Sequence, residues 1–165
     1  QRIATIDTGA GTNTTEFTQI PATFRDLMIF WRGASDGSGQ IDALALRFNG
    51  DGGTNYHSRI LRNQANSTFN ASSGEDDDFT FSVMRVGMVG TAHSAGVIYI
   101  PDYTGSQQKY AHGTCSAVGQ SGLANVYGIL AGGRWTSTAP ITSIRLWPTS
   151  QAWAGHPHLT LVGIR

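Results

Sequence analysis

Apolar residues recur mostly at a period of two along this 165-residue chain, and this period constrains its fold more than any other feature. Ala43 to Phe48 alternates small and large side chains, and Ile141 to Trp147 follows the same pattern up to Pro148. Successive side chains of a strand point to opposite faces, so the pattern is typical of half-buried strands. No long window keeps an apolar stripe at the helical period of 3.6 residues without a Gly or Pro that breaks it.

Clusters of Gly, Ser, Asn and Asp bound the alternating stretches and mark the turns between strands. Residues 63–78 hold one large hydrophobic residue, Phe69, and we expect a long exposed loop there. Short strands at this spacing predict an all-β fold, a jelly-roll-like antiparallel β-sandwich of about ten short strands. The predicted strands are 2–7, 15–20, 24–33, 41–48, 56–62, 79–86, 94–101, 108–116, 124–131, 140–147 and 158–164.

The length suits one domain. Residues 8–15 are all small or polar, so we expect residues 1–14 to include an arm that pairs with a neighbouring molecule, followed by a single β-sandwich domain over residues 15–165. Trp31 and Cys115 lie in predicted strands and are expected in the interior, the cysteine as an inert thiol. The strand residues expected in the core are Leu44, Leu46, Phe48, Ile98, Ile100, Ile141, Ile144 and Leu146.

The charge content excludes several classes of protein. Only 13% of the residues are charged, and Lys+Arg and Asp+Glu balance at 11 each. A neutral chain with scattered Arg is not a general nucleic-acid binder, so we expect no nucleic-acid partner. No apolar run approaches the roughly 18 residues of a membrane-spanning helix, so we expect no membrane partner. So little charge points instead to a surface that faces other protein molecules.

Three segments hold residues that could ligate a metal ion, and for each of them a structural role is favoured. Asp76, Asp77 and Asp78 could hold Ca²⁺, but short charge runs are usually solvated loops. His156 and His158 would share a face of a strand, yet no Glu follows at metal-site spacing. Residues 49–55 lack the spacing of a calcium-binding loop and are typical of a hairpin turn. We therefore expect no metal and no cofactor.

The sequence shows no motif of a known catalytic type, but it contains residues that suit contacts with a partner or a glycan. No Gly-x-Ser-x-Gly motif occurs, and no nucleophile, base or carboxylate pair emerges, so we expect no enzyme. Exposed aromatic rings stack on sugars or anchor protein interfaces. The residues proposed for contact with a partner or a glycan are Trp153, Tyr103, Tyr127, Asp76, Asp77 and Asp78.

A set of spaced motifs adds a resemblance that covers nearly the whole chain. The most specific block is Leu46-Arg47-Phe48-Asn49-Gly50-Asp51-Gly52-Gly53-Thr54-Asn55-Tyr56; the others are Glu16-Phe17-Thr18-Gln19-Ile20-Pro21, Ile100-Pro101-Asp102-Tyr103, Gly133 to Ile144 and Gly155 to Ile164. Their order resembles a family of small β-sandwich virion proteins of tailed bacteriophages. Two positions depart from the family pattern, His156 where Ser is usual and Val162 where Tyr is usual. These motifs fit turn and core positions, so the resemblance implies no active site.

The resemblance implies two functions. The first is a capsid decoration (cement) protein that binds the outer head surface of the virion, with the major capsid protein and its own homotrimer as partners. A short chain of low charge without a second module favours this function. The second is a tail-fibre or receptor-binding module that recognises a host surface glycan through Trp153, Tyr103 or Tyr127, and through loops 49–55 and 63–78. A third possibility is an enzyme that degrades host polysaccharide, and no residue pattern favours it.

Overall fold

Twelve antiparallel strands build two sheets in the part of the chain that this computed structural model describes, and no helix occurs in that part. The described residues are 1–9, 11–13, 15–37, 41–64, 70–72, 81–87, 93–118, 126–149 and 152–165. None of them forms a helix with the length and apolarity that crossing a membrane requires.

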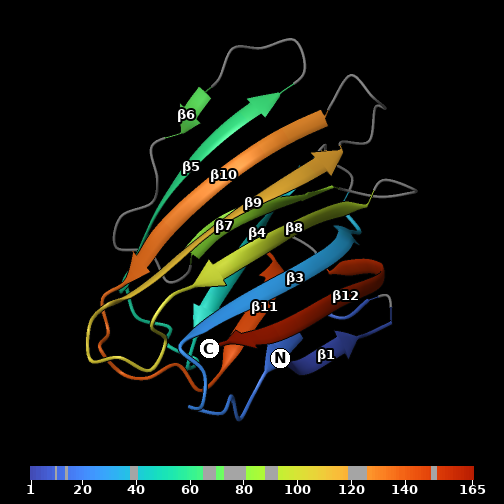
Figure 1. Ribbon diagram of the computed structural model, residues 1–165. Helices are drawn as coiled ribbons and strands as arrows, with labels where there is room; N and C mark the ends of the chain where they lie inside the picture. Colours follow the sequence, from blue (N-terminus) through green and yellow to red (C-terminus); the bar gives the residue numbers. More distant parts are fainter. Residues whose placement is uncertain are drawn as a thin grey trace.

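The larger sheet has eight strands in the order β1-β12-β3-β8-β9-β10-β5-β6, and the smaller sheet has four in the order β2-β11-β4-β7. Figure 1 shows the smaller sheet against one face of the larger. The larger sheet contains β1 (Arg2–Asp7), β3 (Asp26–Ser35), β5 (Tyr56–Gln64), β6 (Asn70–Ser72), β8 (Ser94–Ile100), β9 (Lys109–Val118), β10 (Val126–Trp135) and β12 (Trp153–Ile164). The smaller sheet contains β2 (Thr15–Phe17), β4 (Ile41–Phe48), β7 (Phe81–Gly87) and β11 (Ile144–Pro148).

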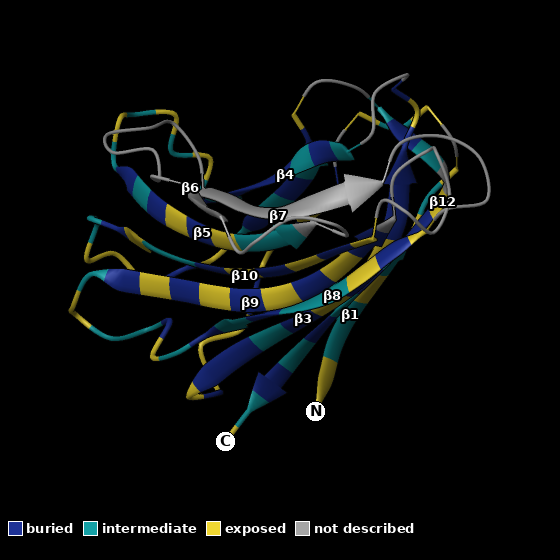
Figure 2. Cartoon of the chain, turned by 90° about the horizontal axis from the view of Figure 1, so that it is seen from above, coloured by how far each residue is buried: buried dark blue, intermediate teal, exposed yellow. Residues whose placement is uncertain are grey.

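The all-β sandwich is confirmed, and its strand order is compatible with the expected jelly roll. Buried and exposed residues alternate along β9, as Figure 2 shows, and each face of the larger sheet therefore has its own set of side chains. The expected loop 63–78 is wrong at residues 63–64, which belong to β5, and at β6, which pairs with β5, while residues 65–69 and 73–78 lie outside the described residues.

The core lies between the two sheets. All eight strand residues expected there are at most 1% exposed, and Trp31 and Cys115 are buried as well. Phe48 on β4 and Trp135 on β10 join the two sheets, with ring centroids 5.6 Å apart. Tyr56 on β5 stacks on Trp135, and its hydroxyl accepts a hydrogen bond from the Phe48 amide at 3.1 Å.

The amino-terminal segment joins the larger sheet in its described residues, and the expected pairing of an arm with a neighbouring molecule stays a prediction. β1 is the edge strand of the larger sheet and pairs with β12 of the same chain. Beyond it, the Gly11 amide donates to the Trp153 carbonyl at 2.9 Å, and the Trp153 amide donates to the Thr12 carbonyl at 2.9 Å. The alternation over residues 2–7 thus marks a strand that its own sheet needs.

Candidate functional site

The aromatic residues expected at a contact surface are interior residues instead. Trp153 and Tyr103 are 0% exposed and Tyr127 is 3% exposed, so their expected exposure is wrong. The Tyr103 hydroxyl donates to the Pro21 carbonyl, which joins two of the family-like motifs. Trp153 covers Gly33 so closely that an added Cβ there would lie 2.6 Å from the indole ring. Asp76, Asp77 and Asp78 lie outside the described residues.

The Arg-Phe-Asn-Gly-Asp block forms a turn whose polar atoms are used by the fold. Asp51 accepts hydrogen bonds from Trp135 Nε1 at 2.7 Å, Asn55 Nδ2 at 2.9 Å and the Gly53 amide at 2.8 Å. Burial alone would raise the pKa of the Asp51 carboxyl, but these donors outweigh it and hold the pKa below its ordinary value. The carboxylate is thus already satisfied inside the turn, which favours the structural role over a calcium loop.

The single lysine of the chain is also internal. Lys109 is 1% exposed, and its ammonium donates to the carbonyls of Gly105, Gln107 and Thr138 at 2.5, 2.6 and 3.2 Å. Burial lowers the pKa of this amine, because the charged form loses water. The side chain therefore fastens two loops at one end of the sandwich and is not presented to a partner.

His156 and His158 do not form a metal centre with other described residues. Pro157, which separates them, is buried, and the register of β12 against β3 shifts between Ala154 and His158. His158 Nδ1 lies 3.5 Å from an Asp7 carboxylate oxygen. Among the described residues, no group of three His, Cys, Asp or Glu side chains could hold a metal ion.

The surface that remains is the outer face of the larger sheet, turned away from the smaller sheet. On this face, register partners on seven neighbouring strands form one row across the sheet, and none of these residues is charged. We call it the cross-sheet row; it consists of Leu61, Leu130, Thr114, Val97, Phe30, Thr160 and Thr5. Leu61, Leu130 and Phe30 are 39%, 50% and 49% exposed. Sequence reasoning missed this row; the alternation of exposed and buried residues along β10, from Val126 to Ala131, indicates only that this strand has an outer face.

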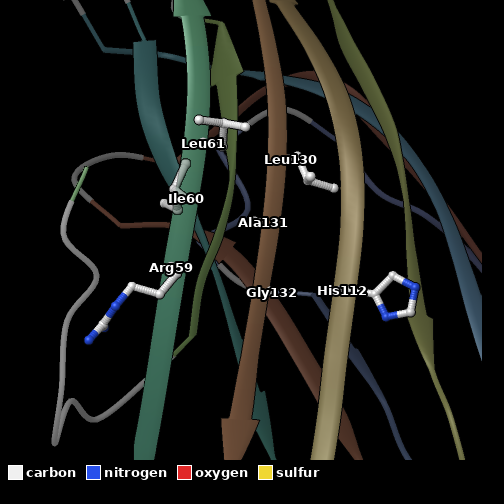
Figure 3. A pocket seen from close by; sticks show the side chains of 7 residues that line it. All are labelled: Arg59, Ile60, Leu61, His112, Leu130, Ala131 and Gly132. Atoms are coloured by element: carbon white, nitrogen blue, oxygen red, sulfur yellow. The ribbon is translucent and has the colours of Figure 1, made fainter. Parts of the chain in front are cut away.

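Hollows lined by described residues indent the outer face. A hollow of about 510 Å³, here called the apolar hollow, is lined by Arg59, Ile60, Leu61, His112, Leu130, Ala131 and Gly132. In Figure 3, Arg59 and His112 extend to opposite sides of Gly132, so the β10 backbone forms the floor. The adjoining cationic hollow, of about 430 Å³, is lined by His57, Ser58, Arg59, Tyr110, Gly132, Gly133 and Arg134. A third, of about 300 Å³, is lined by Phe30, Trp31, Arg32, His158 and Thr160.

The chemistry of this face suits binding more than catalysis. Arg59 and Arg134 are exposed, and none of the described residues that line the apolar and cationic hollows is a carboxylate. A broad face with exposed large apolar side chains marks an interaction site in many proteins. Neither the models of known protein families nor the curated proteins include a match to this chain.

Proposed function

We propose that this chain is a structural virion protein of a tailed phage, a decoration protein on the outer surface of the head, and not an enzyme. The motifs that resemble the phage family support this proposal on the sequence side. Their residues fix turns and join the sheets, as Asp51 with Trp135 and Tyr103 with Pro21 illustrate. A protein whose family-like residues maintain a rigid scaffold presents its function on a surface.

The observation that carries the proposal is the cross-sheet row. Phe30, Leu61 and Leu130 expose large apolar side chains on one face, and threonines continue the row to the edge strand. Covering such a face removes apolar surface from water and contributes roughly 25 cal/mol per Å². No exposed charge interrupts the row, so a partner covers it without desolvating an ion.

The proposed partners are the major capsid protein and further copies of this chain, assembled as a homotrimer. A subunit that binds only the assembled shell stabilises that state by mass action, and the effect grows with the logarithm of its concentration over Kd. Three linked copies would add avidity, because the second and third contacts form within one complex. A shell decorated in this way resists heat and low salt better than a bare shell.

The glycan-binding alternative loses the three aromatic contacts proposed for it. Trp153, Tyr103 and Tyr127 are enclosed by the fold and offer no ring face for a sugar. We therefore keep the head surface, and not a tail fibre, as the proposed location.

Phage particles that lack this protein provide the test. Purified chain should bind to such particles and restore their resistance to heat, as measured by sedimentation and by loss of infectivity at raised temperature. The variant Phe30→Ser should fold normally, because this ring is half exposed, but it should bind at least about tenfold more weakly, since a buried aromatic anchor contributes more than 1.4 kcal/mol.

Trp147→Ser is the matched control. Trp147 is a half-buried aromatic residue on the smaller sheet, where Arg47 and Arg145 lie over its ring. This variant should bind particles like the wild type. Equal heat resistance with and without the chain, or loss of binding in Trp147→Ser but not in Phe30→Ser, would contradict the proposal.

A further inference from the structure

Gly132 lies where the apolar and cationic hollows meet, and the packing of this chain does not require a glycine there. An added Cβ would lie 3.7 Å from His112 Cβ and 3.9 Å from the Ala111 carbonyl oxygen, which is ordinary contact. At Gly96, by contrast, an added Cβ would lie 2.6 Å from the Thr114 carbonyl oxygen. A strand glycine without an internal reason often marks a place where a ligand or another backbone approaches closely.

The two hollows follow one another along the strands. The apolar hollow is lined by residues 130–132 of β10 and the cationic hollow by residues 132–134, so their centres are two residues apart. Two residues of a strand span about 6.7 Å. An extended segment that lies along β10 places its side chains i and i+2 on one face at the same spacing, and it can therefore fill both hollows.

The lining of each hollow selects a different side chain. Leu61 and Leu130 are cross-strand neighbours on β5 and β10, and together they offer an aliphatic surface. Arg134 lies between the register partners His57 and Tyr110, and Tyr110 is 51% exposed. A guanidinium beside a phenol hydroxyl suits a carboxylate, because both can donate hydrogen bonds to it.

We propose that the two hollows bind an extended acidic segment of a partner protein, with an apolar side chain in the apolar hollow, on the Gly132 side of Leu61 and Leu130, and a carboxylate two residues on in the cationic hollow, on the Gly132 side of Arg134 and Tyr110. The segment's backbone would pass over Gly132. This inference rests on the proposed function, in which the partner is a protein of the phage shell, and it names the chemistry of the segment that the shell presents.

An acidic sugar fits less well. A uronic acid would also offer a carboxylate to Arg134, but its hydroxylated ring has no aliphatic side chain for the Leu61 and Leu130 surface. The ring hydroxyls would then leave water for an apolar surface that offers them no hydrogen-bond partner. Glucuronate therefore serves as a competing probe in the test.

The test is a chemical-shift titration of ¹⁵N-labelled protein with the peptide acetyl-Thr-Leu-Thr-Asp-Thr-amide. The amides of residues 130–134 should shift, and binding should weaken when the salt concentration is raised. Replacing the peptide's Asp by Asn, or its Leu by Ala, should weaken binding about tenfold or more, since a charge-assisted hydrogen bond and a buried leucine each contribute more than 1.4 kcal/mol.

Variants of the protein complete the test. Arg134→Gln and Gly132→Ala should each weaken peptide binding about tenfold, the first by removing the charge and the second by filling the floor. Gly128→Ala is the control for the second, because it lies on the same strand outside both hollows with nothing within 4 Å of the added Cβ. Arg32→Gln is the control for the first, and both controls should bind like the wild type.

Several outcomes would overturn the inference: no shift over residues 130–134, equal binding of the Asn peptide, or glucuronate binding as tightly as the Asp peptide. Different results would contradict the proposed function, so the two failures can be told apart. If the peptide does not bind while Phe30→Ser still weakens particle binding, only the inference is wrong. If Phe30→Ser and Arg134→Gln both decorate particles like the wild type, the proposed function is wrong.

Discussion

Asp26 is a buried carboxylate that three parts of the chain share. Its oxygens accept hydrogen bonds from Arg25 Nη2 at 2.8 Å, the Tyr99 hydroxyl at 2.7 Å and the Asp102 amide at 3.1 Å. The hydrogen bond from Arg25 is the main reason that the pKa of Asp26 falls to about 2. At the scale of single residues, this charge holds β3, β8 and the following turn together.

This low pKa predicts how the stability of the protein depends on pH. The unfolded carboxyl has a pKa of about 3.9, so the unfolded state binds the proton first and the charge contributes about 2 kcal/mol above pH 4. That contribution should disappear as the pH falls from about 4 to about 2. Asp26→Asn should therefore be less stable than the wild type at pH 6, and the difference should shrink at pH 2.5. Urea unfolding of both proteins at the two pH values measures this difference in stability. A pH-independent difference would contradict the assignment, because the other carboxyls titrate in both proteins alike.

At the scale of elements, the turn after β4 shows why a short motif fixes a long-range contact. Asn49 has a φ of 51°, in the left-handed region that Asn tolerates better than most residues. Its side chain donates to the Pro140 carbonyl at 2.8 Å and accepts from the amides of Thr142 and Ser143 at 2.8 and 3.1 Å. One residue thereby orients the turn and anchors the segment that leads into β11.

Two substitutions at Asn49 separate these roles. Asn49→Gly keeps the left-handed backbone without strain and loses only the side-chain hydrogen bonds, each worth roughly 1 kcal/mol. Asn49→Ala loses the same bonds and adds about 1 kcal/mol of backbone strain. The expected order of stability is wild type, then Asn49→Gly, then Asn49→Ala, as measured by urea unfolding. Equal stability of the two variants would contradict this order.

The strands were predictable from the sequence because their signal is local. The period of two located all the strands except β6, whose sequence Asn70-Ala71-Ser72 has no large apolar residue. The outer-face site was not predictable, because the cross-sheet row depends on the pairing of β12, β3 and β8, which are distant in the chain. Trp153 and Tyr103 were misplaced for a related reason: each lies at a strand end or in a turn, where tertiary packing decides which way a ring points.

At the scale of the whole molecule, the inner faces of the two sheets provide stability, and the outer face of the larger sheet is the surface that we propose for binding. Their inner faces bury the large apolar residues, whereas the outer face of the larger sheet keeps Phe30, Leu130 and Tyr110 about half exposed. A sandwich with a well-filled interior can hold such a face open, because its stability does not depend on covering these side chains. This division predicts opposite effects for truncations inside and outside the sandwich.

Phe48→Ala and Leu130→Ala test that division. Phe48 is 0% exposed and packs on Trp135 across the sheets, so its truncation should leave a cavity and cost about 3–5 kcal/mol of unfolding free energy. Leu130 is 50% exposed, so its truncation should change stability by less than about 1 kcal/mol. Urea unfolding measures the unfolding free energy of both variants, and the m-value checks that each variant unfolds in one step.

A loss of unfolding free energy below about 1 kcal/mol for Phe48→Ala would place this ring outside the interface between the sheets. A loss of several kcal/mol for Leu130→Ala would mean that the outer face supports the fold itself and is not free to bind a partner.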